Sequence, residues 1–448
     1  MAAAPQKIRI DVWLTDPTKW ATKAEDVALP AASEFNEAHP EYQVEITRYD
    51  FRMLPAEVAR AAERGAPPDV VEYHDAVTRV ALDSLGPDGS PLFTPVGRAI
   101  AGRAEILGEP VVVDDMVPAV RDYFRYAGEL LSMPRTASTM LLFANMDLLA
   151  KAGVTQPPRT WREVTAACAA VAKIPGGGVH GIAWPNFYWP FLQAVAQQGG
   201  LIADRDNGRS GRAEKVNLAS SEMMAFVRWW QRLHQDGNYL YTGEPGDFPG
   251  CFAAFQNQQV ALLLTSSVDA SHLPRRGEQH GFTVGVGPLP YNDEVPLAGN
   301  VLGGMSLWLA AGLPSAKQDG ALAFMQYLNS SRNAAEWAKH HYRIPITRAA
   351  VEVLDRDGWY RRNPHLRVAG DQLEAADGSA AALGPLLGGH AEIMAELTGA
   401  MHDVLVDGAE PEARFRHANE RAQQILDAYN AYCDGPPRRS PDLLAVST

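Results

Sequence analysis

A short apolar segment that ends in polar side chains is the first place in this sequence where binding chemistry is expected. Val70 and Val71 follow a Gly-Ala-Pro-Pro turn, and the chain continues as Glu72-Tyr73-His74-Asp75. Ligands of open α/β sheets bind beyond the carboxyl ends of strands, where such side chains converge. An aromatic ring stacks on a sugar face, and a carboxylate accepts hydroxyl hydrogen bonds. We therefore expect Tyr73, His74 and Asp75 to bind a hydroxyl-rich ligand; the alternatives are a helix-capping role for Asp75 and structural roles for the other two.

Aromatic residues supply the second set of candidates. Residues 184–191 read Trp-Pro-Asn-Phe-Tyr-Trp-Pro-Phe, and the prolines make a regular core element unexpected here. We expect Trp184, Tyr188 and Trp189 to offer a stacking surface for a ligand, with Trp189 favoured and core packing as the alternative. Trp20, in a loop after the first predicted strand, is a further candidate.

Small and hydroxyl residues mark the expected crossings between two lobes. Ser138 precedes the predicted strand at 140–144, and Ser266 and Ser267 follow the one at 260–264; their hydroxyls serve either a ligand or the local backbone. Gly303 and Gly304 open another predicted strand, where the missing side chains allow a ligand or another segment to approach the backbone closely.

Two charged residues complete the candidate site. Asp50 follows a predicted strand and adds a carboxylate suited to hydroxyl or ammonium groups. Arg343, next to His340, His341 and Tyr342, is the expected clamp for an anion or for several hydroxyls; a cation at a surface helix end is the alternative. The adjacent histidines point apart on a helix, so we expect no metal site there, and no cofactor elsewhere.

Composition excludes several classes of protein. The chain has 448 residues, enough for two lobes, and a formal net charge of −13, which argues against a nucleic-acid partner. Apolar runs are too short for a membrane span, and the first residues lack the pattern of an export signal, so we interpret Met1 as an added start on a mature sequence. The three cysteines are far apart; one Cys251–Cys433 bridge stays an alternative. An Ala- and Arg-rich, Lys-poor composition indicates a GC-rich, actinobacterial source.

Alternating strand and helix patterns predict the fold class. Strands are expected at 8–14, 42–46, 70–71, 140–144, 260–264, 284–286 and 303–309, with helices at 24–38, 55–64, 146–152 and 221–235 between them. Thr160, three residues before Glu163, predicts an N-capped helix start. Such alternation is typical of an α/β protein with mostly parallel sheets.

Several motifs, in the same order along the chain, resemble the extracellular solute-binding proteins of ABC importers. The segments carrying the resemblance are 35–40 (Phe-Asn-Glu-Ala-His-Pro), 68–75, 143–149, 158–161 (Pro-Arg-Thr-Trp), 252–264, 303–308, 344–347 (Ile-Pro-Ile-Thr) and 359–364. The last three are similar to the glycerol-phosphate-binding branch. This resemblance implies two α/β lobes that close on a ligand held between them. It places Asp75, Ser138, Ser266, Gly303 and Gly304 at ligand-lining positions.

The resemblance also implies a division of the chain. We expect residues 1–136 and 268–329 to form the first lobe, residues 137–267 and 330–434 to form the second, and residues 435–448 to be a disordered tail. Two departures concern the ligand. Arg343 stands where the glycerol-phosphate branch has a tyrosine, and the segment around Leu383-Gly384 lacks the arginine that this branch uses on phosphate.

These observations favour a non-enzymatic, monomeric, extracytoplasmic protein, lipid-anchored in its precursor, that delivers a carbohydrate or glycerol-containing glycoside to permease subunits. A glycerophosphodiester or other anionic ligand, clamped by Arg343, is the main alternative. A glycosidase is a weaker one, because the chain contains no GxSxG, P-loop, dinucleotide or HExxH motif.

Overall fold

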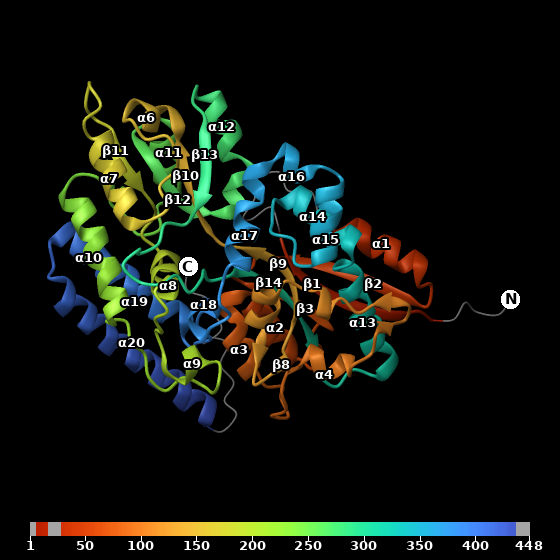
Figure 1. Cartoon of the computed structure of the whole chain (residues 1–448). Helices are drawn as coiled ribbons and strands as arrows, with labels where there is room; N and C mark the ends of the chain where they lie inside the picture. The colour runs from red at the N-terminus through yellow and green to blue at the C-terminus, as the bar shows by residue number, and fades with distance from the viewer. Residues whose placement is uncertain (1–5, 17–27, 436–448) are drawn as a thin grey trace.

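The computed structural model describes residues 6–16 and 28–435, which fold into two α/β lobes lying side by side (Figure 1). The predicted two-lobed architecture is therefore confirmed. The first lobe contains a six-stranded sheet of order β2-β1-β3-β14-β4, in which β9 also pairs with β14. Its strands are β1 Ile8–Thr15, β2 Tyr42–Tyr49, β3 Val70–His74, β4 Phe93–Thr94, β9 Met133–Ser138 and β14 Gly303–Ala310.

The second lobe contains a four-stranded sheet of order β11-β12-β10-β13. Its strands are β10 Met140–Asn145, β11 His180–Ala183, β12 Val260–Ser266 and β13 Val284–Pro288. Both sheets are mixed, and in each a single strand, β14 in the first and β10 in the second, runs against all the others, so most strands of each sheet point the same way. β1 runs parallel to β2 and β3, but β14 is antiparallel to β3, β4 and β9, and β10 is antiparallel to β12 and β13. β10 and β14 are the strands that follow the crossings between lobes, and each enters its new sheet in the direction opposite to its neighbours.

Helices cover the sheets of both lobes. Those around the first sheet are α1 Ala28–Ala38, α2 Leu54–Glu63, α3 Thr78–Asp83, α4 Val96–Ile100, α5 Pro118–Tyr123 and α13 Ser315–Leu328. Those of the second lobe are α6 Met146–Lys151, α7 Trp161–Val171, α8 Tyr188–Gln197, α9 Asp204–Gly208, α10 Ser221–Gln235, α11 Phe248–Gln256, α12 Leu273–Gln279, α18 Ala380–Leu383, α19 His390–His402 and α20 Pro411–Asp434. Near the junction lie α14 Ser331–His341, α15 Arg348–Arg356, α16 Trp359–Arg362 and α17 Val368–Glu374 (Figure 1).

The division between lobes differs from the predicted one in two places. Residues 284–288 form β13 and pair with β10, and α12 packs on β13, so this stretch belongs to the second lobe and not to the first. Residues 331–356 pack against the first lobe: the Val117 amide donates to the Ile346 carbonyl at 2.9 Å, and the Ala349 amide donates to Asp115 at 3.0 Å. The chain therefore crosses between the lobes at Thr139, over residues 289–302, and once more between α15 and α18.

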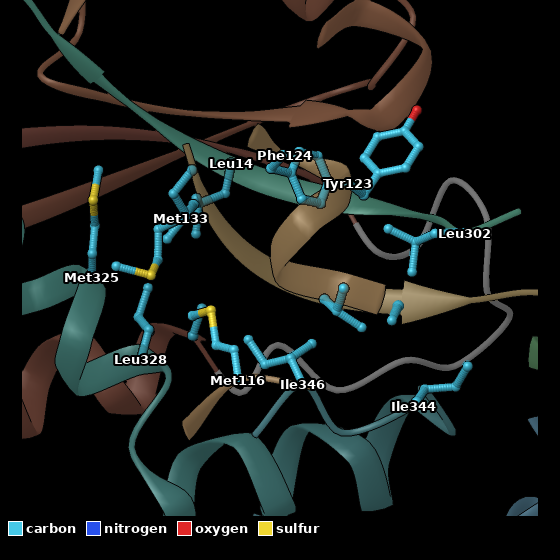
Figure 2. Packing of buried hydrophobic residues seen from close by; sticks show 14 of the residues in the cluster. Leu14, Met116, Tyr123, Phe124, Met133, Leu302, Met325, Leu328, Ile344 and Ile346 are labelled. Carbon is cyan, nitrogen blue, oxygen red and sulfur yellow. The ribbon is translucent and has the colours of Figure 1, made fainter. Parts of the chain in front are cut away.

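Apolar side chains fill the first lobe and continue to the junction. Figure 2 shows Met116, Met133, Ile344 and Ile346 packed together, with the hydroxyl of Tyr123 pointing away from the aliphatic groups. Residues from β9, α5 and the segment after α14 thus share one cluster, which connects the junction to the first sheet. Within residues 6–16 and 28–435, no helix combines the length and hydropathy that a bilayer crossing needs.

Local expectations can be compared with individual contacts. Thr160 caps α7, as predicted, because its Oγ1 accepts the Glu163 amide at 3.1 Å. All three cysteines are unpaired, so the Cys251–Cys433 bridge is absent; Cys168 and Cys251 are buried and Cys433 is half-buried. Trp20 and residues 436–448 of the predicted tail lie outside the described residues.

Candidate functional site

Asp75 is placed between the lobes by the end of β3. It is the first residue of a 3-10 turn, η2 Asp75–Val77, and its Oδ1 accepts the Gly304 amide at 2.9 Å and lies 3.0 Å from His74 Nε2. The residue is 9% exposed. Burial raises the pKa of the Asp75 carboxyl, while His74, the Gly304 amide and Arg343 act in the opposite direction. His74, not Asp75, caps the turn, since its Nδ1 accepts the Ala76 amide at 3.3 Å. The capping alternative for Asp75 is therefore wrong.

A second histidine, His390, approaches His74 from the other lobe. α19 begins at His390 and packs against η2 of the first lobe. The His390 ring is buried and stands edge-on to Tyr188, with centroids 5.5 Å apart. Burial, assisted by the nearby His74, lowers the pKa of His390 to about 4, so its imidazole is neutral at physiological pH. Phe51 completes this corner, its ring centroid 6.0 Å from that of His74.

The aromatic wall comes from the first turn of α8. Tyr188 and Trp189 are half-buried, and the carboxylate of Asp75 joins burial in raising the pKa of Tyr188. Trp189 lies over the backbone of Gly303 on β14: a Cβ added there would be 2.7 Å from Trp189 Cζ2. Glycine at 303 therefore lets an indole from one lobe rest on a strand of the other. We call Asp75, His74, Tyr188, Trp189, Gly303 and His390 together the interlobe site.

The two glycines and Ser138 have different surroundings. Gly304 faces the Thr136 carbonyl, which leaves no room for a side chain, and its amide binds Asp75. The Ser138 hydroxyl donates to the Gly303 carbonyl at 3.1 Å. Ser138 thus fixes the strand on which Trp189 rests.

Arg343 lies among carboxylates, one of which is Asp75. Burial lowers the pKa of its guanidinium to about 10, against the attraction of Asp269, Glu72 and Asp75. Glu72 is further held by Arg135 Nη1 at 3.2 Å and by the Thr15 amide at 2.9 Å. Burial raises the pKa of Asp269 to about 6. Nearby carboxylates thus balance the positive charge of Arg343. A buried, balanced guanidinium does not fit the alternative of a cation at a surface helix end.

Two predicted ligand residues belong to the core instead. Tyr73 is 5% exposed and packs edge-on to Phe93, because successive strand residues face opposite sides and its side is covered by α2 and α3. Trp184 is fully buried against Trp229 and Trp230, and its carbonyl accepts the Tyr239 hydroxyl at 2.6 Å. Both are removed from the candidate site.

The remaining candidates contact local backbone. Ser266 Oγ accepts the Val268 amide at 3.3 Å, and Ser267 Oγ accepts the Thr139 amide at 3.2 Å, so Ser267 ties two crossing segments together. Asp50 Oδ1 accepts the Arg52 amide at 3.0 Å in the turn before α2. Ser267 and Arg343 also line a pocket beside the junction, together with Tyr342, Trp359, Tyr360 and His365. Among the described residues, no group of three His, Cys, Asp or Glu side chains is arranged to hold a metal ion.

Sequence reasoning missed His390, Phe51 and Tyr123. Tyr123 reaches the Asp75 carbonyl with its hydroxyl at 3.4 Å. The glycine pair before His390, which opens a long helix, was the available signal; Phe51 follows Asp50 at the carboxyl end of a strand and had the same signal as Asp75.

The arrangement is an acid and a histidine on the first lobe facing a histidine and two aromatic rings on the second, and comparison with known proteins gives it a family. Residues 30–368 match the model of the bacterial extracellular solute-binding protein family. The chain belongs to this family. It is the solute-binding component of an ABC importer.

Individual relatives of this solute-binding protein agree. The periplasmic sn-glycerol-3-phosphate-binding protein UgpB of Pectobacterium atrosepticum is 26% identical over 409 residues, covering 88% of this chain and 87% of the relative. In structure, the sugar-binding protein MalE of Xanthomonas citri aligns with a TM-score of 0.76 at 20% identity, covering 96% of this chain and all of that one. UgpB of Mycobacterium tuberculosis, solved with glycerophosphocholine, aligns at 0.71 and 20% identity over 95% and 99% of the chains. The two structural likenesses support the fold.

Proposed function

We propose that this solute-binding protein captures a neutral or ammonium-bearing carbohydrate between its lobes and delivers it unchanged to membrane permease subunits. The ligand would be a di- or oligosaccharide, an amino sugar or a glycosyl-glycerol. The observation that carries the proposal is the interlobe site: Asp75 on the first lobe faces Tyr188 and Trp189 on the second. An indole stacks on the C–H face of a sugar, and a buried carboxylate accepts its hydroxyl groups.

Local charge supports this class of ligand. His390 is neutral because burial lowers its pKa to about 4, and the charge of Arg343 is balanced by nearby carboxylates. An anionic group next to Asp75 would add repulsion that neither residue offsets. A hydroxyl or ammonium group would instead bind the carboxylate directly.

A glycerophosphodiester is the second candidate. Of the named relatives, one UgpB is an sn-glycerol-3-phosphate-binding protein and the other was solved with glycerophosphocholine. A quaternary ammonium group suits an aromatic wall with an adjacent carboxylate, so the choline end of such a ligand would fit Trp189 and Asp75. Its phosphate would need a donor, and Arg343 is the candidate that the sequence indicated.

The proposal excludes turnover. A retaining glycosidase needs two carboxylates about 5–5.5 Å apart across the scissile bond. Glu72, the nearest carboxylate in sequence to Asp75, is instead held by Arg135 and Thr15.

We further propose a monomer located outside the cytoplasm and held there by a lipid anchor.

A thermal-shift panel tests the function. Maltose and other disaccharides, glucosamine, glycerol 3-phosphate and glycerophosphocholine are compared with the ligand-free protein, and the best ligand is then tested on Asp75→Asn. Asp293→Asn is the matched control, because Asp293 pairs with exposed Arg162 on the surface of the second lobe. Ligand at a hundredfold excess over its dissociation constant stabilises by about 2.7 kcal/mol. Stabilisation by sugars that Asp75→Asn abolishes supports the first candidate; stabilisation by phosphate esters alone supports the second, and release of sugar from an aryl glycoside contradicts both.

A further inference from the structure

The segment around α9 has an unusual backbone and reaches from the second lobe toward the first. Arg205, Asp206, Asn207 and Gly208 all have positive φ, between 53° and 76°, so they form one left-handed turn. Such runs are disfavoured for L-residues and persist only where surrounding contacts hold them. Here the Asn207 side chain accepts the amides of Ile202 and Ala203 at 2.9 and 3.1 Å.

The turn aims two arginines across the junction. Arg209 Nη1 donates to the Tyr123 carbonyl of the first lobe at 2.9 Å, while its other nitrogens bind the Leu383 and Gly384 carbonyls of its own lobe. Arg212 Nη2 donates to Asp83 Oδ1 at 3.0 Å, and Asp83 is the last residue of α3 in the first lobe. These contacts lie beside the ends of α9 and α20, on the side of the molecule away from α14–α17 (Figure 1).

Asp83 receives donors from both lobes. Its side chain is only 8% exposed. Within its own lobe it accepts Arg79 Nε at 2.7 Å and Arg79 Nη2 at 2.5 Å; from the second lobe it accepts Arg212 and the Tyr429 hydroxyl, the latter at 3.0 Å. Tyr429 belongs to α20, and its ring covers Gly388, two residues before His390 of the interlobe site.

This geometry is suited to opening and closing. When the lobes separate, Asp83 keeps both hydrogen bonds from Arg79, and Arg212 keeps its ion pair with Asp434 at 2.6 Å. Neither charge is then left buried without a partner, which is the situation that makes a broken ion pair costly. Closure adds the Arg212 and Tyr429 contacts and removes the Asp83 carboxylate from water. Charge-assisted hydrogen bonds are stronger in the protein interior than in water.

We propose that Asp83, with Arg212 and Tyr429, is an interlobe latch that sets how long a bound solute is retained without touching it. The latch holds the two lobes together on the side of the molecule away from α14–α17. Release of solute requires opening, so the latch acts on the dissociation rate more than on the association rate. The inference rests on the proposed function only where a solute is used to measure it.

Small-angle scattering of the ligand-free protein tests the latch without any solute. Asp83→Asn, Arg212→Gln and Tyr429→Phe are compared with Glu129→Gln, a control that removes an exposed ion pair with Arg98 inside the first lobe. We expect the three latch variants, but not the control, to increase the radius of gyration. Tyr429→Phe keeps the ring over Gly388 and removes only the hydroxyl, so it remains informative if the charge variants fold poorly. Scattering profiles identical to wild type for all folded latch variants would overturn the proposal.

Stopped-flow dissociation of glycerophosphocholine or maltose, whichever binds wild type, gives the second readout. We expect Asp83→Asn to release the probe about tenfold faster with little change in the association rate, and Tyr429→Phe to show a smaller effect in the same direction. If these residues merely stabilised the fold, their substitution would lower the unfolding temperature and leave the dissociation rate of the probe unchanged. That result would contradict the latch. If neither probe binds wild type, maltose and glycerophosphocholine are excluded as ligands, while the scattering result still decides the latch.

Discussion

Substituting Gly303 by alanine tests whether closure brings Trp189 onto β14. The added methyl group would lie 2.7 Å from Trp189 Cζ2 and 3.0 Å from Cη2, whereas carbon atoms prefer separations of about 3.5–4.0 Å. The φ of Gly303 is not in the left-handed region, so alanine meets no backbone strain there. The clash with Trp189 joins residues of different lobes and disappears when the lobes open, whereas the 3.2 Å approach to Ser138 Oγ lies within the first lobe and is the same in both states. Gly303→Ala should therefore destabilise the closed arrangement and leave each lobe folded.

Over-packing of this kind costs about 1–3 kcal/mol. Placed on the closed state, that cost weakens solute binding by roughly 5- to 150-fold. Titration calorimetry with the best ligand of the thermal-shift panel measures the loss, and thermal unfolding of the ligand-free protein checks that the fold is intact. Gly399→Ala is the control: the nearest atom to its new methyl group is Arg414 Nη2 at 3.8 Å, and alanine should stabilise helix α19 by about 0.5–1 kcal/mol.

A double-mutant cycle makes the test specific. In a Trp189→Ala background the methyl group of Gly303→Ala has no indole to meet, so its effect on affinity should largely vanish. Wild-type affinity in Gly303→Ala alone, or the same loss with and without Trp189, would refute the contact between lobes.

Further predictions concern protonation and thiols. Because burial lowers the pKa of His390 to about 4, the unfolded state binds more protons than the folded state between that value and about 6.5. Relative to His390→Asn, wild type should lose about 3 kcal/mol of unfolding free energy as the pH falls from 7 to 4, measured by urea unfolding; parallel pH profiles would show that His390 is not buried as a neutral ring. The cysteines are unpaired, so a thiol reagent should titrate only half-buried Cys433 rapidly in the native protein and all three residues after unfolding. Fewer than three reactive thiols after unfolding would contradict three unpaired cysteines.

Local pattern was enough to place the two strands that carry the site, β3 and β14, but not α8, because the prolines in residues 184–191 made a regular element unexpected there. The strand before Asp75 and the helix at 221–235 were predicted because apolar periodicity and Gly or Pro boundaries are encoded within a few residues. The direction of pairing was not encoded there. Nothing local to residues 284–288 tells whether the strand joins the first sheet or the second, and its pairing with β10 depends on contacts far along the chain.

The same limit explains the site residues. Trp184 and Trp189 share one aromatic run, yet Trp184 follows a buried strand and enters the core, while Trp189 lies in the first turn of α8 and meets Gly303. Tyr73 and His74 are adjacent and face opposite sides of β3. His390 comes near His74 only because α19 packs across the junction, so its role could not be predicted from its neighbours in sequence.

The most direct test of the account is the affinity of Asp75→Asn and Trp189→Ala for the best ligand, measured by titration calorimetry beside wild type. Hydrogen bonds to a charged group contribute about 1.5–3 kcal/mol, so loss of the Asp75 charge should weaken binding by roughly 10- to 150-fold, and removal of the Trp189 indole should also weaken it. Wild-type affinity in both variants, with the fold intact, would show that the solute does not bind between this acid and this indole.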